Sequence, residues 1–356
     1  MESKLSIFIV VALLAVAMFL PFSETDAVDS EMFSYKSQLD DNGLLVYNEV
    51  SKATTLNGLS REFIIAFSDS SLYGYDTEDK AKAYADSVVQ NALSAAYLSN
   101  PMVPYLWDYP VKAVQVDASV SQVIVKSETG ETTYYKVDKV AFTLTVPEGI
   151  TSDSMKELEE AIKSYDFGSG SDADKVSQMI KALNKLKFKA DEEGKISNIY
   201  NALVEKECTS AGVAQAFSRF CALNNIPSII VAGDNLKAND EPKNFWNYVY
   251  LEGDHDGKTA YAWYVVDASY CADAGICGSR TTVDYDDGSY SISAILNVDL
   301  NLSGENDLTV PTLNSDKYVG PGGPSFLELH GEKLVLAALG VILVVGMLYA
   351  VRSGNF

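Results

Sequence analysis

The most chemically suggestive residue of the sequence is Cys208, which stands just ahead of a predicted helix. From Ser210 to Leu223 apolar residues recur at helical spacing, which predicts a buried helix with Cys208 at its N-terminal edge. The unpaired N–H groups and the positive dipole end of a helix N-terminus stabilise a thiolate, the nucleophilic form of cysteine. Cysteine is also a common small core residue, so its position alone fits either role.

Two predicted strands that follow this helix carry the other polar candidates. The stretch NFWNYVYLEG begins at Asn244, and TAYAWYVVDAS contains Asp267 near its end. The turn sequence GDHDG between them predicts a hairpin, and SIIVAG ahead of them predicts a further buried strand. An aspartate at a strand end can act in chemistry or can accept backbone N–H bonds in a loop.

In this order, these stretches resemble the transglutaminase-like superfamily, whose core is related to papain-like cysteine proteases. The family's cysteine helix, its G-I-P–strand–G step, its H-A-W-N strand and its W-Y-x-V-D strand match ECTSAGVAQAF, NNIPSIIVAG, NFWNYVYLEG and AWYVVDASY. The resemblance implies an α+β fold in which a buried helix, with the cysteine at its N-terminus, packs on an antiparallel sheet. A mixed α/β module precedes the core, as in secreted or membrane-anchored prokaryotic members.

The resemblance also implies an incomplete catalytic triad. In active members a cysteine attacks an amide carbonyl, a histidine is base and acid, and an aspartate orients the histidine. When these roles are carried over to the matching positions, Cys208 corresponds to the nucleophile and Asp267 to the orienting aspartate. Asn244 stands where the family has its histidine. An amide cannot accept and return a proton near neutral pH. The two histidines of the chain are poor substitutes, because His255 is expected at the far end of the hairpin, roughly 25 Å or more from Asn244, and His330 lies near the C-terminus.

Three function classes follow from these observations. The first is a catalytically degenerate domain with a binding or cell-surface role, whose ligand is a peptide or cell-envelope material. The second is an active thiol enzyme, an amide hydrolase or peptidase or a cross-linking acyl transferase, that uses Cys208 on surface peptides. Glu207 precedes this cysteine, and its charge is expected to raise the thiol pKa. The third is a structural surface protein whose N-terminal module, residues 28–148, binds the partner.

Both ends of the chain predict an extracytoplasmic protein with one membrane anchor. Residues 1–27 read as a signal peptide, with an uncleaved N-terminal anchor as the alternative. Residues 334–351 carry no charge and extend about 27 Å as a helix, enough to cross a hydrocarbon core. A linker over 301–333 and a cytoplasmic tail over 352–356 flank this span. The bulk of the chain is therefore expected outside the membrane.

The expected location of the chain outside the membrane affects the interpretation of several residues. Cys271 and Cys277 lie six residues apart in a glycine-containing loop, where either a local disulfide or two reduced thiols fit. Asn301 begins an N-x-S sequence and is a glycosylation candidate. Neither histidine has a ligand spacing with cysteine, so no metal or other cofactor is expected.

The acidic composition excludes one class of partner. The 356 residues hold 27 Lys and Arg against 49 Asp and Glu, a formal charge of −22, and such a surface repels nucleic-acid backbones. Periodicity divides the exterior part into an N-terminal α+β module (28–148) and a transglutaminase-like domain (149–300). Helices are predicted over 40–53, 77–99, 152–165, 173–188 and 196–206, and strands over 61–68, 119–127 and 132–146. Ser152 or Ser154, ahead of Glu157, is the predicted cap of the third helix.

Overall fold

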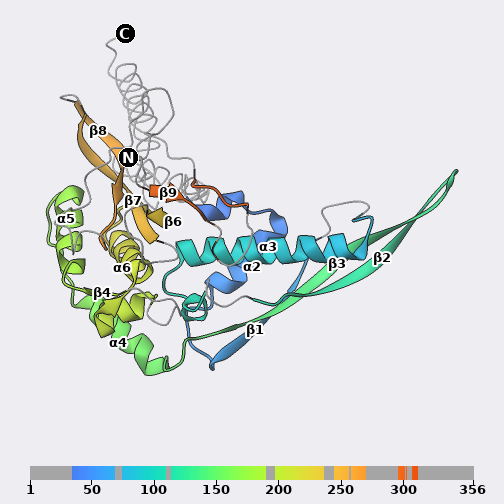
Figure 1. Cartoon of the computed structure of the whole chain (residues 1–356), viewed down its shortest axis with the longest axis horizontal. Coiled ribbons are helices and arrows are strands. Elements are labelled where there is room, and N and C mark those ends of the chain that lie inside the picture. Colours follow the sequence, from blue (N-terminus) through green and yellow to red (C-terminus); the bar gives the residue numbers. More distant parts are fainter. Residues whose placement is uncertain are drawn as a thin grey trace, which may run out of the picture. The chain divides into compact units, whose positions relative to one another are not determined.

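The computed structural model (Figure 1) describes residues 34–68, 74–109, 114–189, 197–235, 244–255, 258–269, 296–300, 302 and 307–311. All of them belong to one compact unit, Glu31–Tyr318. None of the helices in this described part has the length and apolar character needed to cross a membrane. The predicted signal peptide, membrane span and tail lie outside the described residues, as do Cys271, Cys277, Asn301 and His330.

A three-stranded antiparallel sheet forms the first half of the described chain, in the order β1-β3-β2. The long helix α3 contacts β2 and β3, and Figure 1 shows it running alongside the sheet. Thr77 caps α3, because its side chain accepts a hydrogen bond from Lys80 N. The elements of this half are η2 (Tyr35–Gln38), α2 (Asp41–Ser51), β1 (Ser60–Ala66), α3 (Glu78–Ser99), η3 (Pro104–Leu106), β2 (Asp117–Ser127) and β3 (Gly130–Thr145).

A helix-rich segment and a second antiparallel sheet, in the order β8-β7-β6-β9, form the other half. Helix α6 contacts β6 and β7, so the buried helix packs on an antiparallel sheet as expected. The elements are α4 (Ser152–Lys163), α5 (Asp172–Leu183), β4 (Lys187–Phe188), η4 (Asn201–Glu205), β5 (Glu207–Cys208), α6 (Ser210–Leu223), β6 (Ser228–Asn235), β7 (Asn244–His255), β8 (Lys258–Val266) and β9 (Leu296–Val298).

Three local predictions were wrong in detail. The helix predicted over 173–188 ends at Leu183, because the following residues form β4 and pair in parallel with β5. The helix predicted over 196–206 contains the π-helix η4, and Lys206 after it has a left-handed φ of 62°. Helix α4 is capped by Thr151, whose side chain and that of Ser154 form a capping box.

Residues of both halves share one hydrophobic core. The ring of Tyr97 on α3 contacts that of Phe245 on β7, with centroids 6.0 Å apart. The buried hydroxyl of Tyr35 in η2 donates a 2.8 Å hydrogen bond to the carbonyl of Ile230 on β6. The second sheet is therefore supported both by α6 and by elements of the first half.

Candidate functional site

The structure brings together two of the three predicted site residues. Asn244 is the first residue of β7, and Asp267 directly follows β8, which pairs with β7. Asn244 Nδ2 donates a 2.9 Å hydrogen bond to Asp267 Oδ2. The other oxygen, Oδ1, accepts from Ser269 N at 3.1 Å and from Ser269 Oγ at 2.6 Å. The carboxylate is thus held both by the β7 side chain and by the loop that follows β8.

The third polar group at this point is the hydroxyl of Ser210, which the sequence reasoning missed. Ser210 is the first residue of α6 and is fully buried. Its Oγ accepts a 3.1 Å hydrogen bond from the backbone N–H of Phe245, the neighbour of Asn244. One turn further along α6, Ala214 O accepts a 3.1 Å hydrogen bond from Asn247 Nδ2. The start of α6 is therefore fixed against the start of β7, with the serine hydroxyl at the junction.

Cys208 occupies a different place, in the two-residue strand β5. Thr209 separates Cys208 from the first residue of α6, and the side chain of Cys208 is fully buried. The carbonyl of Cys208 accepts a 3.0 Å hydrogen bond from Lys189 N. A Cβ added at Gly212, in the first turn of α6, would lie 2.9 Å from Cys208 Cβ. Cys208 therefore packs under the first turn of the helix, in the hydrophobic core.

Glu207 is neutralised by two neighbours, which the sequence reasoning did not anticipate. Its carboxylate forms ion pairs with Lys187 Nζ and, at 3.2 Å, with Lys189 Nζ. Hydrogen bonds from Lys187 and Lys189 hold the pKa of Glu207 below its ordinary value.

The position of His255 along its strand agrees with the expectation from the sequence. It is the last residue of β7 and pairs with Lys258 at the turn. Eleven residues of extended chain separate it from Asn244, which corresponds to about 36 Å along the strand. This histidine cannot act at the junction of α6 and β7.

The junction joins the side chains of Ser210, Asn244 and Asp267 to their neighbours by hydrogen bonds. Asn244 makes the hydrogen bond to Asp267 that an imidazole N–H would make, but it has no second nitrogen that titrates near neutral pH. A serine hydroxyl is a weak nucleophile unless a base takes its proton. The serine, amide and carboxylate side chains can hold this junction together and can form hydrogen bonds.

Comparison with known proteins gives only distant structural likenesses. No known family and no curated protein matches the sequence. A solved structure described as a TGase is 12% identical, with a TM-score of 0.26, and the match covers 59% of this chain and 51% of that one. A candidate cysteine protease from Cytophaga hutchinsonii is 11% identical, with a TM-score of 0.25, over 52% of this chain and 84% of that one.

The periplasmic domain of TgpA from Pseudomonas aeruginosa is 13% identical over 46% of this chain and 66% of that one, with a TM-score of 0.21. This chain spans about half the length of the TGase structure. Identities and TM-scores this low do not place the chain in a family.

Proposed function

We propose that this protein is a catalytically inactive member of the transglutaminase-like superfamily, anchored in the membrane by its C-terminal segment with the bulk of the chain outside. Its role is to bind a peptide or cell-envelope ligand at the cell surface. The observation that carries the proposal is the hydrogen bond from Asn244 Nδ2 to Asp267 Oδ2, because it puts an amide where the resemblance requires the base.

Ser210 adds a second replaced residue to the proposed loss of catalysis. The resemblance puts the nucleophile at the start of the buried helix, and the residue that begins α6 and meets β7 is Ser210. We assign the nucleophile place to Ser210 in preference to Cys208. In this assignment both proton-transferring members of the triad are replaced, and only the orienting Asp267 is retained.

In the alternative function, an active thiol enzyme, Cys208 would have to be the nucleophile. A nucleophilic thiol must be reached by substrate and must sit beside a base. Cys208 and Ser210 are both fully buried, but Ser210 begins α6 and meets β7, whereas Cys208 precedes the helix by two residues. The described geometry therefore favours a core role for this cysteine.

Restoration of the triad tests the proposal. The full-length chain is compared with the Ser210→Cys variant, the Asn244→His variant and the double variant, each also carrying Cys208→Ala. Alkylation by iodoacetamide is followed against pH, with the modified site mapped by mass spectrometry. We expect the double variant to contain a thiol that titrates below about 8.5, the ordinary value, because an imidazole then stands beside it. In the Ser210→Cys variant alone, the thiol is expected to titrate at or above that value.

The same proteins, together with a variant that carries Cys208→Ala alone, are assayed for release of amine from peptide amides. We expect no turnover by the natural chain. Turnover that Cys208→Ala abolishes would establish the thiol-enzyme alternative in place of the proposal. An ordinary thiol in a double variant that melts like the natural chain would contradict the assignment of Ser210.

A further inference from the structure

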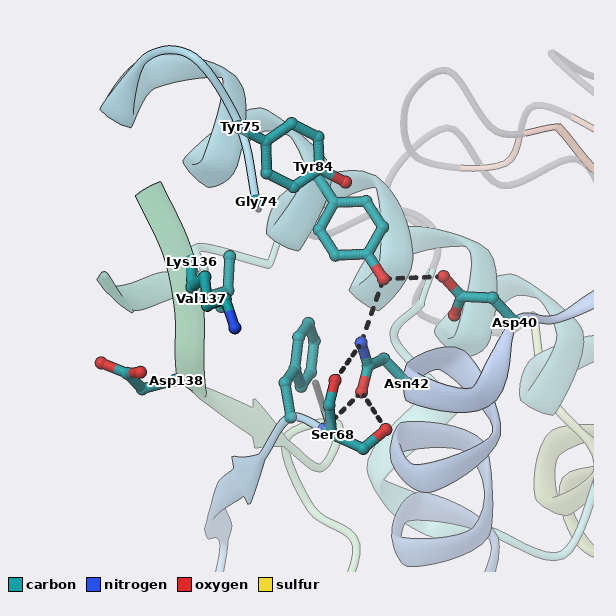
Figure 2. A pocket seen from close by; sticks show the side chains of 10 residues that line it. Asp40, Asn42, Ser68, Gly74, Tyr75, Tyr84, Lys136, Val137 and Asp138 are labelled. Atoms are coloured by element: carbon teal, nitrogen blue, oxygen red, sulfur yellow. Dashed lines mark hydrogen bonds between the residues drawn. The ribbon is translucent and has the colours of Figure 1, made fainter. Parts of the chain in front are cut away.

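A cavity of about 320 Å³ opens in the first half of the chain, away from the α6–β7 junction. Its walls come from the N-terminus of α2, the end of β1, the first turns of α3 and the middle of β3 (Figure 2). This volume is at the small end of the range for ligand pockets. Ten residues line it: Asp40, Asn42, Phe67, Ser68, Gly74, Tyr75, Tyr84, Lys136, Val137 and Asp138.

A network of hydrogen bonds fixes one wall of this cavity. The hydroxyl of Tyr84 donates to Asp40 Oδ2 at 2.8 Å and accepts from Asn42 Nδ2 at 3.0 Å. Asn42 Oδ1 accepts from Ser68 N at 2.8 Å, and Asp40 Oδ1 accepts from Gly43 N at 2.7 Å. Asn42 itself is buried. Figure 2 shows this chain of bonds along the side of the pocket. The wall is therefore pre-organised, which lowers the entropy cost of binding a ligand.

Aromatic rings form a corner beside this network. The ring of Phe67 meets that of Tyr84 nearly at right angles, at 78° with centroids 6.3 Å apart. The ring of Tyr75 lies 5.2 Å from that of Tyr84. The backbone of Tyr75 is pinned to Tyr135 on β3 by two hydrogen bonds of 2.7 Å. Burial raises the pKa of both Tyr75 and Tyr84, so these phenols are neutral at physiological pH. The corner offers flat apolar surface of fixed orientation.

The rim of the cavity is shaped by two backbone irregularities. The pairing of β2 with β3 slips by one residue, so that Asp138 is left as a bulge residue of β3. Gly74 has φ of 72°, and a Cβ there would lie 2.4 Å from Tyr135 O. Only glycine fits this approach, which brings the segment before α3 onto β3. Bulges of this kind often lie beside binding sites, where they re-aim a side chain.

Charges of opposite sign face each other across the cavity. The Asp40 carboxylate belongs to the hydrogen-bonded wall, and Figure 2 shows Lys136 on the β3 side, across from Tyr84 and Asn42. The Asp138 carboxylate accepts a 2.9 Å hydrogen bond from Ser121 Oγ on β2. An ionic ligand of either sign would meet a like charge on one wall. A neutral ligand that both donates and accepts hydrogen bonds suits both walls.

We propose that this cavity binds a neutral saccharide of one or two rings. Sugar hydroxyls can donate to the remaining lone pairs of Asp40 and accept from the ammonium of Lys136. The C–H face of a sugar ring can pack on the aromatic corner of Tyr75 and Tyr84. The site is independent of the α6–β7 junction, so it holds whether or not that junction is inactive.

Ligand-observed NMR with the full-length chain, in a detergent without a sugar headgroup, tests this proposal. The probes are glucose, galactose, mannose, N-acetylglucosamine and their disaccharides, at up to about 10 mM, which detects a millimolar Kd. We expect at least one sugar to bind. Lys136→Met is expected to weaken binding about tenfold or more, because it removes a charged donor. Tyr75→Leu is expected to weaken it as well.

Two matched variants serve as controls. Lys139→Met changes an exposed lysine of the same strand, and Tyr134→Leu changes a tyrosine of β3 that does not line the cavity. Both are expected to bind as the natural chain does. The proposal is wrong if no sugar of the panel binds, if Lys136→Met binds as tightly as Lys139→Met, or if tetramethylammonium binds at this cavity in place of the sugars.

Discussion

At the residue scale, Asn244 and its neighbour Phe245 tie the start of β7 to the loop after β8 and to α6. Its amide donates to Asp267 at 2.9 Å, and its backbone neighbour Phe245 donates to Ser210 at 3.1 Å. Both bonds tie β7 to its surroundings, and neither requires a group that titrates. The hydrogen bonds themselves therefore stabilise the junction.

Substitution Asn244→Asp is expected to destabilise the protein in a pH-dependent manner. It replaces a hydrogen-bond donor by a second carboxylate opposite Asp267, and each charge raises the pKa of the other. The raised folded-state pKa means that the penalty is small below the unfolded value of about 4 and grows as pH rises through the folded value. At pH 7 we expect a loss of about 1–3 kcal/mol in the free energy of unfolding. Urea unfolding at about pH 4.5 and pH 7.5 measures the difference.

The matched control for this prediction is Asn244→Ala, which removes the same hydrogen bond without adding charge. Its loss of stability is expected to be similar at both pH values. If Asn244→Asp also showed the same loss at both, the two side chains would not be in contact in solution.

At the element scale, the close approach of α6 to the segment before η4 depends on Gly212. A Cβ at this position would lie 2.7 Å from Asn198 O and 2.9 Å from Cys208 Cβ. The first contact is with backbone, which cannot rotate away. Gly212→Ala is therefore expected to cost about 1–3 kcal/mol of stability, although alanine is the better helix former. Thermal unfolding of the purified chain measures the cost.

Gly43 in α2 supplies the comparison for that substitution. A Cβ there would lie 3.2 Å from Asp40 Oδ1 and from Leu39 Cβ, contacts that a shift of a few tenths of an ångström would relieve. Gly43→Ala is expected to be close to neutral, since the gain in helix propensity offsets the tighter contact. Equal losses for the two variants would mean that α6 can shift to accommodate the added methyl group.

The sequence predicted the elements whose signals are local and missed those that need a distant partner. Helix α6 and the β7–β8 hairpin follow from periodicity and turn residues, and both were placed well. Strand β4 was read as helix because its partner β5 lies twenty residues later in the chain. Ser210 was missed for a related reason: cysteine drew attention as a nucleophile, and only tertiary structure shows which residue of the helix start meets β7.

Tyr84 of α3 packs against α2 at the cavity, and its partly buried phenol predicts that the stability of the chain falls at alkaline pH. Burial, together with the hydrogen bond to Asp40, raises the pKa of Tyr84 from 10.0 to about 12. A raised folded-state pKa contributes stability below the unfolded value, and this stability is lost as pH rises through about 12. Between about pH 9 and pH 11.5, the melting temperature of the natural chain is expected to fall further than that of the Tyr84→Phe variant. Parallel losses would show that the phenol is not buried in solution.

At the scale of the whole molecule, the two halves predicted as separate modules share contacts in one core. Tyr97 of α3 meets Phe245, the residue that also donates to Ser210. The first half therefore supports β7, the strand on which the α6–β7 junction is built.

The hydrogen bond from Tyr35 to Ile230 tests whether the halves unfold together. It joins residues 195 positions apart and is buried. We expect thermal unfolding of the described unit to be a single transition, with tryptophan fluorescence and far-UV circular dichroism coinciding. Tyr35→Phe keeps the ring and removes the hydroxyl, and is expected to lower the stability by about 1 kcal/mol without splitting the transition. Two separate transitions in the natural chain would mean that the halves fold independently, and Tyr35→Phe would then shift neither of them by more than a few tenths of that amount.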